Sequence, residues 1–520
     1  MQLLNKKKIF ELLYNRHKGE FLSLKDLPPP SSFKDMQKAV SHLAAAIKDG
    51  KKIALIGDYD VDGVVATTII REFFEYINYP INWIIPNRFS DGYGISKGVI
   101  DKIEADVIIT VDNGIVAFEA ADVCFERGID LIITDHHSVD EKLPVATAII
   151  NQKQKDCNFK YKEICGAQIA WYFVAALNSK LKANFNVKNL LDLVALAIVA
   201  DIMPLTHINR AMLIAGMQLF KKKKRAFIRA LDKRLNFKDI NSEIIGYYLA
   251  PLINSAGRLD DAKIASEFLF TKDENKALEI LDILIELNNE RKRLEKEITT
   301  KAIKQVSPKD NIAIVWGSDW NEGVVGIVAA RVANHFKMPA IALSCKNGIC
   351  KGSGRSYGDC DLFSLASHAK ELYDKFGGHK MALGLSFKQE NLKLIKSILN
   401  LAAKDCNKDY IDKSILGILP FSEIDFELLE ILEKFEPYGE ANLKPKFIAK
   451  DVEVLQIYEV GQNREHKKYK LKQDKKVLFA MEFRSKSNLN IGDRIDFIFT
   501  ISKNIYQESV YINLYIEEII

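Results

Sequence analysis

The segment LIITDHHSVD, residues 131–140, places an aspartate and two histidines directly after a short apolar run. The run LIIT has the length and the composition of a buried β-strand. The chain contains only nine histidines, so two adjacent ones at the end of a strand are informative. We therefore expect Asp135, His136 and His137 to belong to a functional site.

Two apolar runs upstream end in carboxylates in the same way. IALIGDYDVDG places Asp58, Asp60 and Asp62 after one run, and VIITVDN places Asp112 after the other. In an open parallel sheet the carboxyl ends of the strands form the ligand crevice, so these side chains can converge although they are far apart in sequence. Converging carboxylates repel one another, and the usual remedy is a divalent cation.

Apolar strands alternate with helical stretches from residue 52 to residue 151. The strands IALIG, NWIIP, DVIITV, DLIIT and TAIIN are separated by stretches such as ATTIIREFFEYI and VAFEAADVCFERG. This alternation is the βαβ signature of a parallel, doubly wound sheet. The sequence therefore predicts an α/β fold for the first large domain.

The remainder of the chain divides by composition. The charged amphipathic stretch before Pro308 lacks Gly and Pro, which favours one helix bridging two domains, although a surface helix of the first domain fits the pattern equally well. NIAIVW, PAIALSC and GLSF then restart a smaller α/β unit, and the β-branched and aromatic runs after PKFIAKDVEV predict an antiparallel barrel of about five strands, the size of an OB-fold. We predict an N-terminal arm (1–30), a catalytic domain (31–272), a connecting helix (273–306), a second α/β domain (307–405) and the barrel (420–520).

Length and composition describe a globular protein of several domains. The chain has 520 residues, too many for one core, and its apolar content of 48% and charged content of 28% are ordinary. The net charge of +5 is compatible with an anionic partner without demonstrating one. The N-terminus lacks a long apolar segment, and the most apolar stretch, LLDLVALAIVADIMPL, contains two acids, so we predict no signal peptide and no transmembrane helix.

The cysteines and the charge runs give little information about the chemistry of the protein. The seven cysteines include no CxxC pair, which predicts reduced thiols in a cytosol rather than disulfides or a zinc site. The run KKKKR at 221–225 is typical of a solvated helix end. In the barrel region, lysines and aromatics interleave through Lys467, Lys468, Tyr469, Lys470 and Lys472, a pattern that favours single-strand binding.

The aspartates of GDYDVDG alternate, so their side chains can act together from one side of an extended segment. Taken alone, a calcium-type loop or acids that cap a helix explain them as well. Combined with Asp112 and His136 they favour a metal site, in which carboxylate and imidazole ligands suit Mn²⁺ and also allow Mg²⁺. The ligands exceed what one catalytic ion needs, so we infer two ions about 3.5 to 4 Å apart.

Other candidates are weaker when judged by position alone. Asp201 follows a helix-length apolar run and is typical of a helix-terminal acid. GSGRS, which contains Arg355, can form a phosphate cradle, but such loops are common. A loop histidine such as His379 is more often structural. Arg88 and Tyr93 follow a strand, where a cation and an aromatic can meet a phosphate and a base, but an ordinary loop explains them equally well.

Together these motifs resemble those of the DHH phosphoesterases, and within them the bacterial RecJ single-stranded-DNA exonucleases, over nearly the whole chain after residue 30. GDYDVDG, VDNGI, TDHH and VADIMPL are similar to the first four motifs of the family. INSAGRLDD resembles its glycine-arginine motif, and GVVGIVAARV resembles the motif that opens the helix of the second domain. GSGRS and FGGHK resemble the substrate motifs of the DHHA1 domain.

The resemblance implies both architecture and activity. It implies a DHH domain that holds the metals, a DHHA1 domain that closes over the nucleotide, and an OB-like barrel that guides the strand. It also implies hydrolysis of single-stranded DNA from the 5′ end to nucleotides in DNA repair and recombination. The implied partners are single-stranded DNA, a single-stranded-DNA-binding protein and a helicase. We expect no association with a membrane and a location in the cytoplasm.

Roles for individual residues follow from the same resemblance, which makes Asp201 a metal ligand. The implied metal ligands are Asp58, Asp60, Asp62, Asp112, His136 and Asp201. The implied catalytic residues are Asp60, Asp62, Asp135, His136 and His137. The implied substrate-binding residues are Arg88, Tyr93, Arg258, Ser353, Gly354, Arg355 and His379.

The chain departs from the family pattern at two motif residues and in the run PYGEANLKP before the barrel, and two other functions compete with the exonuclease. Leu252 stands where the family usually has an arginine, and Asn321 stands where it usually has a histidine. One alternative is a DHH phosphodiesterase acting on short oligoribonucleotides or cyclic dinucleotides, although such relatives are usually shorter and lack the barrel. The other is a RecJ-like scaffold without activity, which has no chemical need for so many unpaired acids.

Overall fold

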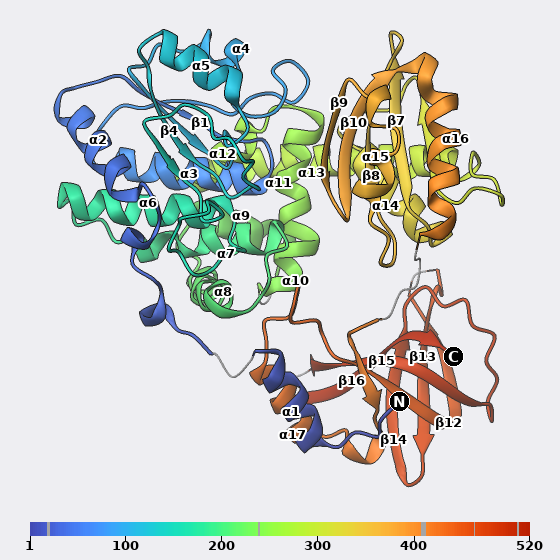
Figure 1. The fold of residues 1–520 in the computed structure, drawn as a ribbon. Coiled ribbons are helices and arrows are strands. Elements are labelled where there is room, and N and C mark those ends of the chain that lie inside the picture. Colours follow the sequence, from blue (N-terminus) through green and yellow to red (C-terminus); the bar gives the residue numbers. More distant parts are fainter. Residues whose placement is uncertain (18–20, 238–239, 407–411, 462, 507–508) are drawn as a thin grey trace.

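The computed structural model describes residues 1–17, 21–237, 240–406, 412–461, 463–506 and 509–520. Its strands form three sheets, and each sheet is built from a different part of the chain (Figure 1). Two of the sheets lie side by side with the helix α13 between them, and the third lies below both. The predicted fold class is confirmed for all three parts.

The first sheet is entirely parallel, in the order β2-β1-β3-β4-β5. Its strands are β1 (Ile53–Ile56), β2 (Asn82–Ile84), β3 (Val107–Val111), β4 (Asp130–Thr134) and β5 (Ala148–Ile150). The chain moves outward from β1 to β2 and then crosses back to β3, so the winding reverses between β1 and β3. In doubly wound sheets such a reversal opens the ligand crevice at the carboxyl ends of the strands.

Helices cover both faces of this sheet because alternate strand residues point to opposite sides. Ile53 and Leu55 pack in the core with α2, α3 and α6, whereas Ala54 and Ile56 pack in the core with α4 and α5. Figure 1 shows α4 and α5 above the sheet and α3 and α6 below it. These helices are α2 (Met36–Lys48), α3 (Val61–Tyr76), α4 (Lys97–Ile100), α5 (Phe118–Glu126) and α6 (Gly166–Leu181).

A helical layer completes the first part of the chain. It comprises α7 (Leu191–Ala200), α8 (His207–Lys221), α9 (Ala226–Leu235), α10 (Ser242–Ile244), the π-helical turn η4 (Ile245–Leu249), α11 (Ala250–Leu259) and α12 (Lys263–Phe270). The long helix α13 (Glu274–Ile303) then packs on α9, α11 and α12 at one end and on α14 at the other. The predicted bridging helix is therefore confirmed.

The second sheet is mixed, in the order β6-β7-β8-β10-β9, and only the β6–β7 pair is parallel. Its strands are β6 (Ala313–Gly317), β7 (Ala340–Lys346), β8 (Ile349–Arg355), β9 (Lys375–His379) and β10 (Ala382–Lys388). Its helices are α14 (Val325–Phe336), α15 (Leu362–Ser367) and α16 (Leu392–Ala402).

The third sheet closes on itself, because β12 pairs with both β13 and β15. Five strands form the barrel, as predicted, and a sixth, β11, adds parallel to β12. The strands are β11 (Ile415–Ile418), β12 (Lys446–Val460), β13 (His466–Gln473), β14 (Lys476–Glu482), β15 (Arg494–Tyr506) and β16 (Ser509–Ile519).

The N-terminal helix α1 (Lys6–Arg16) is part of this third unit. Ile9 and Leu13 are buried in the same core as Phe435 and the barrel residues, and Lys6 forms ion pairs with Asp425 and Glu427 beside α17 (Phe426–Lys434). Both termini of the chain therefore meet at the barrel, a contact that no local sequence pattern predicts.

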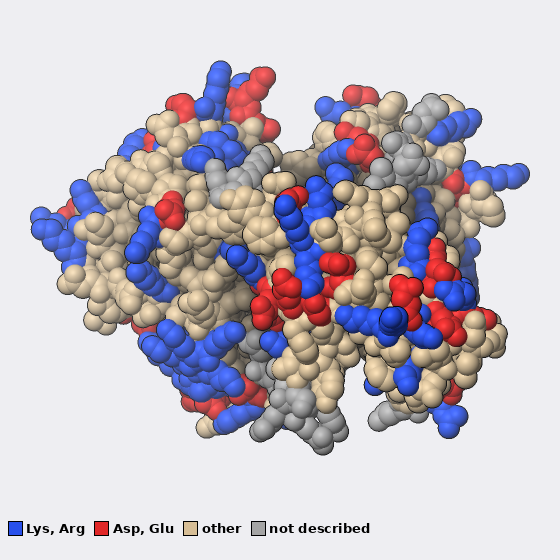
Figure 2. Space-filling view, turned by 90° about the horizontal axis from the view of Figure 1, so that it is seen from below, with Lys and Arg blue, Asp and Glu red and all other residues tan. Residues whose placement is uncertain are grey.

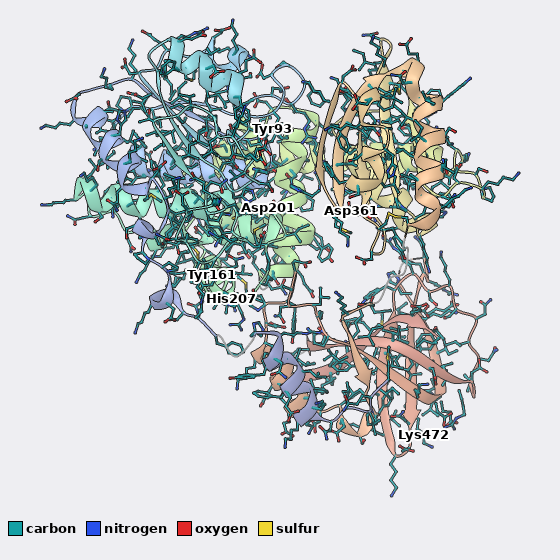
Figure 3. All side chains as sticks on the ribbon, in the orientation of Figure 1. Tyr93, Tyr161, Asp201, His207, Asp361 and Lys472 are labelled. Carbon is teal, nitrogen blue, oxygen red and sulfur yellow. A yellow bond between two sulfur atoms is a disulfide. The ribbon has the colours of Figure 1, made fainter. Side chains whose placement is uncertain are left out.

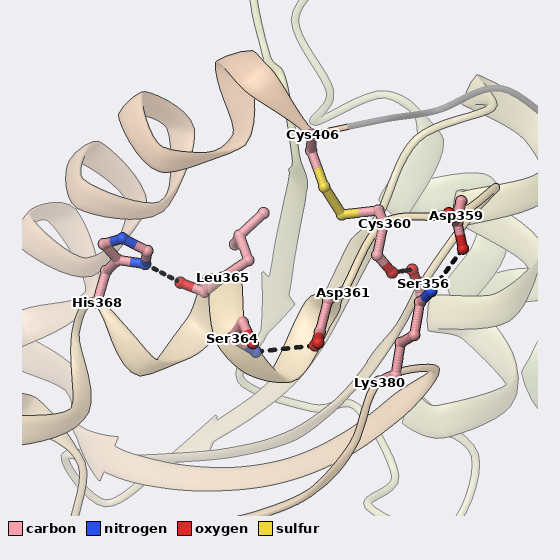
Figure 4. The surroundings of a disulfide bond; sticks show 9 residues. All are labelled: Ser356, Asp359, Cys360, Asp361, Ser364, Leu365, His368, Lys380 and Cys406. Carbon is pink, nitrogen blue, oxygen red and sulfur yellow. Dashed lines mark hydrogen bonds and ion pairs between the residues drawn. A yellow bond between two sulfur atoms is a disulfide. The ribbon is translucent and has the colours of Figure 1, made fainter.

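The prediction of reduced thiols is wrong for four of the seven cysteines. Cys345 and Cys350 form a disulfide because the antiparallel pairing of β7 and β8 places them opposite each other. Cys360, which precedes α15, forms a second disulfide with Cys406 after α16 (Figure 4). Counting cysteines cannot detect such pairs, because the contacts are made by the fold. Within the described ranges, no helix combines the length and the apolarity needed to cross a bilayer.

Candidate metal centre and anion-binding site

Three aspartates enter the site from the turn between β1 and α3. Asp58 is buried directly after β1, and Asp60 caps α3 by accepting a hydrogen bond on Oδ1 from the amide of Gly63 at 3.1 Å. A glycine is needed at position 63, because a Cβ there would lie 2.6 Å from the Cβ of Asp58. Asp62 lies in the first turn of α3. One short turn thus brings three carboxylates to the edge of the sheet.

The start of α6 holds two of the site's acids in place. The carboxylate of Asp62 accepts hydrogen bonds from the amides of Gly166 at 2.6 Å and Ala167 at 2.8 Å, both at the N-terminus of α6. A Cβ at Gly166 would lie 2.6 Å from Oδ1 of Asp112, so the helix approaches both acids closely. Helix N-termini stabilise negative charge, so α6 supports carboxylates that are buried away from water.

The ends of β3 and β4 supply the next group. Asp112 follows β3 in a left-handed backbone conformation, with φ of 62°. Asp135 is buried after β4, and its Oδ1 lies 2.7 Å from Nδ1 of His137, while its Oδ2 accepts a hydrogen bond from the amide of Ile115. Asp135 therefore orients the second histidine and links the two strand ends.

His136 lies at the centre of the acids. Its Nε2 is 3.2 Å from Oδ1 of Asp112 and 3.7 Å from carboxylate oxygens of both Asp62 and Asp201. Asp201 arrives from the C-terminal end of α7, so the fold brings this acid to the strand ends. Three sets of ligand atoms each lie within 4.8 Å of one another: Asp112 with His136 and His137, Asp62 with His136 and Asp201, and Asp58 with Asp60 and Asp112.

Without a cation these acids are held in an unfavourable environment. Burial, and after it the charge of Asp60, raises the pKa of Asp58 well above its usual range. Burial and the charge of Asp62 do the same to the pKa of Asp112, and they raise the pKa of Asp201 to about 9. Buried carboxylates with raised pKa values are characteristic of functional sites, where a cation or a proton must neutralise them.

The two adjacent histidines have opposite electrostatic environments. Burial lowers the pKa of His136, which favours the neutral ring that can bind a metal. Burial also disfavours the charged form of His137, but the hydrogen bond with Asp135 outweighs it and raises the pKa of His137 to about 9. His136 is therefore suited to coordination, and His137 is suited to carrying a positive charge near an anion.

The donor set fits divalent cations. In the described part of the chain, Oδ1 of Asp58 and Oδ2 of Asp201 are buried and accept no hydrogen bond. Buried oxygens without a partner cost free energy unless a cation occupies the space beside them. Carboxylate oxygens with one or two imidazoles suit Mn²⁺ or Mg²⁺ better than soft metals. The residues present can therefore hold the ions that the sequence predicts.

A group of arginines faces the acids from the boundary between the first two sheets. Arg258, on α11, donates a hydrogen bond from Nη1 to the carbonyl of Gly323 at 3.0 Å, which joins the two domains. Burial, followed by the positive charges of Arg88 and Arg291, lowers the pKa of Arg258 to about 10, and Arg355 contributes as well. Clustered guanidinium groups of this kind form a natural binding site for a phosphate.

The second domain contributes a strand and a helix start to the anion site. Ser353 and Arg355 lie on β8, and a Cβ at Gly326 in α14 would lie 3.4 Å and 3.3 Å from their side chains. Gly354 lies between them, and its carbonyl accepts a hydrogen bond from Arg355. His379 is exposed at the end of β9. It pairs with Ala382 of β10, and Ala382 pairs on its other side with Arg355 of β8.

Tyr93 lies beside the acidic cluster, in the same domain as Asp201 (Figure 3). Its hydroxyl donates a hydrogen bond to the carbonyl of Asp112 at 3.4 Å, and its ring contacts Tyr59 and His137 edge-on. The guanidinium of Arg88 stacks over the ring of Tyr59 at 4.2 Å. The rings of Tyr93 and Tyr59 thus connect the acidic cluster to Arg88.

The two motif residues that depart from the family pattern have clear structural positions. Leu252 is buried in the first core. The Oδ1 of Asn321 accepts a hydrogen bond from the amide of Gly323 at 2.7 Å and so folds the turn that presents the Gly323 carbonyl to Arg258.

Sequence reasoning missed Arg291. This residue is buried on α13, bound to Asn288 at 3.0 Å and to Glu295 at 2.7 Å. Asn288, Arg291 and Glu295 are polar residues at helical spacing on the inner face of α13, where apolar residues are expected. This pattern is the sequence signal that could have identified Arg291.

Comparison with protein families matches this division of the chain. Residues 52–198 match the DHH family, N-terminal domain, residues 309–405 match the DHHA1 domain, and residues 416–518 match the RecJ OB domain. A crystal structure of RecJ with Mn²⁺ from Thermus thermophilus shares the fold, with a TM-score of 0.86 at 23% identity, over 100% of this chain and 79% of that one. A second structure, of exonuclease RecJ bound to manganese, gives a TM-score of 0.63 at 27% identity over 72% of this chain and 96% of that one.

Two curated relatives carry the same name. The chain is 32% identical to the single-stranded-DNA-specific exonuclease RecJ of Bacillus subtilis over 503 residues, which cover 93% of this chain and 63% of that protein. It is 33% identical to the protein of that name from Escherichia coli over 461 residues, which cover 82% of this chain and 79% of that protein. The chain thus spans less than two thirds of the first relative and about four fifths of the second. It belongs to the RecJ family.

Proposed function

We propose that this chain is a metal-dependent exonuclease that degrades single-stranded DNA from the 5′ end to nucleotides. The observation that carries the proposal is a buried cluster of acids and imidazole facing arginines from two domains. The acidic side suits phosphodiester hydrolysis, and the basic side suits a phosphate at the end of a chain. The names of the curated relatives, single-stranded-DNA-specific exonucleases, support the same activity.

The acidic cluster would hold two divalent ions. When bound, Mn²⁺ or Mg²⁺ supplies charge neutralisation at the scissile phosphate and makes water more acidic. Asp112 and His136 each lie in two of the three ligand groups, so both would belong to the middle of the cluster that holds the ions. The ligands that we propose are Asp58, Asp60, Asp62, Asp112, His136 and Asp201.

His137 would act on the substrate directly, and Asp135 would position it. Asp135 holds Nδ1 of His137 and keeps the ring protonated, so the ring can donate a charged hydrogen bond to a phosphate oxygen. Charge that develops on the phosphate during hydrolysis would then be stabilised by a group that is already in position.

The arginine group would bind the 5′-terminal phosphate. Arg355 and Ser353 lie on the rigid strand β8, and Arg258 and Arg88 approach from the first domain. Burial lowers the pKa of Arg355, and a bound phosphate would compensate that cost. An enzyme that fixes the terminal phosphate at one side and cleaves at the other would release one short product per cut.

The barrel would guide the rest of the strand. Lys468, Lys470 and Lys472 alternate with the buried Tyr469 and Leu471 on β13, so the lysines lie outside the barrel. Tyr469, the aromatic of the interleaved pattern, cannot stack on bases, because its ring lies in the core. Exposed aromatics of this face include Tyr458, which pairs with Lys468 across β12 and β13, and Phe479, over which Lys468 lies at 4.7 Å. Figure 3 shows Lys472 at the end of the barrel farthest from the metal centre.

Electrostatics across the face seen in Figure 2 would contribute less. The face seen in Figure 2 carries Lys and Arg in several separate groups, with Asp and Glu among them, and no continuous basic track. Strand binding on this face would therefore depend on a small number of local contacts, in agreement with the mild net charge of +5.

One assay tests the proposal. End-labelled single-stranded DNA, duplex DNA and short RNA are each incubated with the full chain in Mn²⁺, Mg²⁺ or EDTA. We expect loss of label only from single-stranded DNA and only with a metal. Preferential cleavage of the short RNA would favour a different DHH phosphodiesterase, and binding of DNA without cleavage would favour a scaffold.

We extend the proposal to a role in DNA repair and recombination in the cytoplasm, with a single-stranded-DNA-binding protein and a helicase as partners. The family membership supports these assignments, since single strands with a free 5′ end are the proposed substrate. Acceleration of the exonuclease on duplex DNA by an added helicase would test the functional partnership.

A further inference from the structure

Three large apolar side chains are exposed on two segments that pack on each other near the metal centre, the turn η4 and the end of α7. Tyr247, Tyr248 and Ile202 have 79%, 60% and 68% of their surface exposed. Single exposed apolar residues are common, but several that share one surface indicate a contact site. We call these three residues the tyrosine patch.

The patch adjoins the acidic cluster through α7. Ile202 directly follows Asp201 and has a left-handed backbone conformation, with φ of 54°. The turn η4, which carries both tyrosines, packs on the end of α7, where a Cβ at Gly246 would lie 3.3 Å from Cγ1 of Val199. The patch therefore lies next to the helix end that positions a proposed metal ligand.

The two tyrosines lie on an unusual backbone turn, which leads into the helix that carries Arg258. The turn η4 is π-helical and continues directly into α11, which carries Arg258. Such π-helical turns occur frequently at functional sites. The ring of Tyr248 rests edge-on against Phe237, which holds it in place, whereas Tyr247 is the more exposed of the two. The patch thus combines a fixed ring with a freely accessible one.

The helix α10, which directly precedes the turn with the two tyrosines, is attached to the segment before the barrel. Ser242, on α10, donates a hydrogen bond from Oγ to the carbonyl of Tyr438, and Glu243 forms an ion pair with Lys444 at 2.8 Å. These partners lie in the segment that leads into β12. Figure 1 shows α10 at the edge of the first domain that faces the barrel. The patch therefore lies between the metal centre and the barrel.

We propose that the tyrosine patch stacks against bases of the single strand on the 3′ side of the scissile phosphate. This inference rests on the proposed function. Every nucleobase has a π-face, so aromatic side chains can hold a strand without reading its sequence. In a duplex the faces of the bases are already covered by their neighbours. The patch would therefore favour single strands over duplexes at a position beyond the metal ions.

The test compares long and short substrates. The double variant Tyr247→Ala/Tyr248→Ala is assayed on a 5′-phosphorylated strand of about 20 nucleotides, longer than a typical OB-fold site, and on a 5′-phosphorylated dinucleotide. One lost stacking contact of about 1 to 3 kcal/mol corresponds to a rise in KM of about 5-fold to 150-fold on the long strand. The dinucleotide ends at the metal centre, so its KM should change less than about twofold.

Two further variants control for the chemistry of the ring and for general effects. Tyr247→Phe/Tyr248→Phe keeps the stacking faces and should retain the KM of the unmodified protein. Tyr76→Ala removes another exposed tyrosine of the same domain, at the far end of α3, about 24 Å from Asp60. It should leave both substrates unaffected.

The outcomes separate this inference from the proposed function. If the unmodified protein degrades single strands and the double alanine variant has an unchanged KM for the long strand, the stacking role is wrong. An equal rise in KM on the dinucleotide would overturn it as well, because the loss would then lie at the metal centre. Failure of the unmodified protein to cleave any strand would reject the proposed function itself.

Discussion

The acidic and the basic halves of the site are assembled in different ways. The acids and imidazoles all come from the first domain, at strand ends and helix ends that one core holds together. The arginines come from two domains: Arg88 and Arg258 lie in the first, and Arg355 lies on β8 of the second. The acidic half is therefore complete within one folding unit, whereas the basic half requires two units in the right orientation.

This difference assigns different tasks to the two halves. The contact between Arg258 and the carbonyl of Gly323 is one of the bonds that fix the orientation of the domains. Changes in the acidic half should stop the chemistry on every substrate. Changes in the basic half should alter which ends are preferred and leave cleavage itself possible.

The largest effect is expected from the acidic half. Asp60→Ala and His136→Ala should reduce cleavage by more than about a hundredfold, because loss of a residue that only supports a metal ligand already costs 10- to 100-fold. Single-strand binding should persist, including in EDTA. Steady-state rates and binding by fluorescence anisotropy measure the two properties separately.

Asp60→Asn refines this prediction, because asparagine keeps the cap of α3 but removes the charge. It should lose activity without the stability loss of about 1 kcal/mol that removal of a cap brings. Asp122→Ala, an exposed acid on α5, is the matched control and should remain active. Near-normal turnover of Asp60→Ala would contradict the assignment of two metal ions.

A second large effect is expected when the metal is removed and the pH is raised. Burial raises the pKa of Asp58 and Asp112, and it raises that of Asp201 to about 9. A carboxyl group with a raised pKa in the folded state stabilises the fold most at low pH, and this contribution is lost as the pH rises through the folded pKa. In EDTA the Tm should therefore fall between about pH 5 and pH 9.

Saturating Mn²⁺ should reduce this fall, because a bound cation stabilises the charged carboxylates. Differential scanning calorimetry of the same protein in EDTA and in Mn²⁺ measures both slopes. Identical dependence of the Tm on pH in the two conditions would show that the acids do not form the metal site.

The acidic half could be predicted from the sequence because its signals are local. Asp58 and Asp112 each follow a short apolar strand, and the parallel sheet brings all strand ends to the same edge. Asp201 illustrates the limit of this reasoning. By position it is a helix-terminal acid, and only the packing of α7 against α3 and α6 places its carboxylate 3.7 Å from His136.

Contacts between distant segments gave no such signal. The burial of Ile9 beside Phe435 depends on how the two ends of the chain pack together, and the disulfide between Cys360 and Cys406 depends on how distant segments of the second domain pack. The role of Asn321 is similar, because its hydrogen bond to the Gly323 amide becomes meaningful only when Arg258 approaches from the other domain. Local patterns predict elements, whereas the joints between domains are decided by surfaces that are far apart in sequence.

A smaller and more selective effect is expected in the basic half. Arg355→Ala removes a charged donor to the terminal phosphate, and such a hydrogen bond contributes about 1.5 to 3 kcal/mol. The preference for 5′-phosphorylated over 5′-hydroxyl ends should therefore fall by about 10- to 100-fold. Lys351→Ala, on the same strand but exposed and paired with Glu322, should keep the preference. Equal losses on both ends would instead make Arg355 a general backbone contact.

The smallest effect is expected at the barrel, which is the region farthest from the chemistry. Deleting the barrel would also expose Ile9 and Leu13 of α1, so substitutions on β13 are the cleaner test. Lys468→Ala/Lys470→Ala should weaken binding of long single strands. Each lost phosphate contact should flatten the salt dependence by about 0.7 in log-log slope, and cleavage of very short oligonucleotides should be unaffected.

The charge run in the first domain provides the matched control for the barrel lysines. Lys222→Ala/Lys224→Ala removes the same number of exposed charges from the end of α8 and the turn that follows it. If the run is only a solvated helix end, this variant should keep both affinity and salt slope. Equal slopes for the two double variants would mean that the barrel lysines act through net charge alone, and would remove the proposed guiding role. A flatter slope for the barrel variant alone would place at least one phosphate contact on β13.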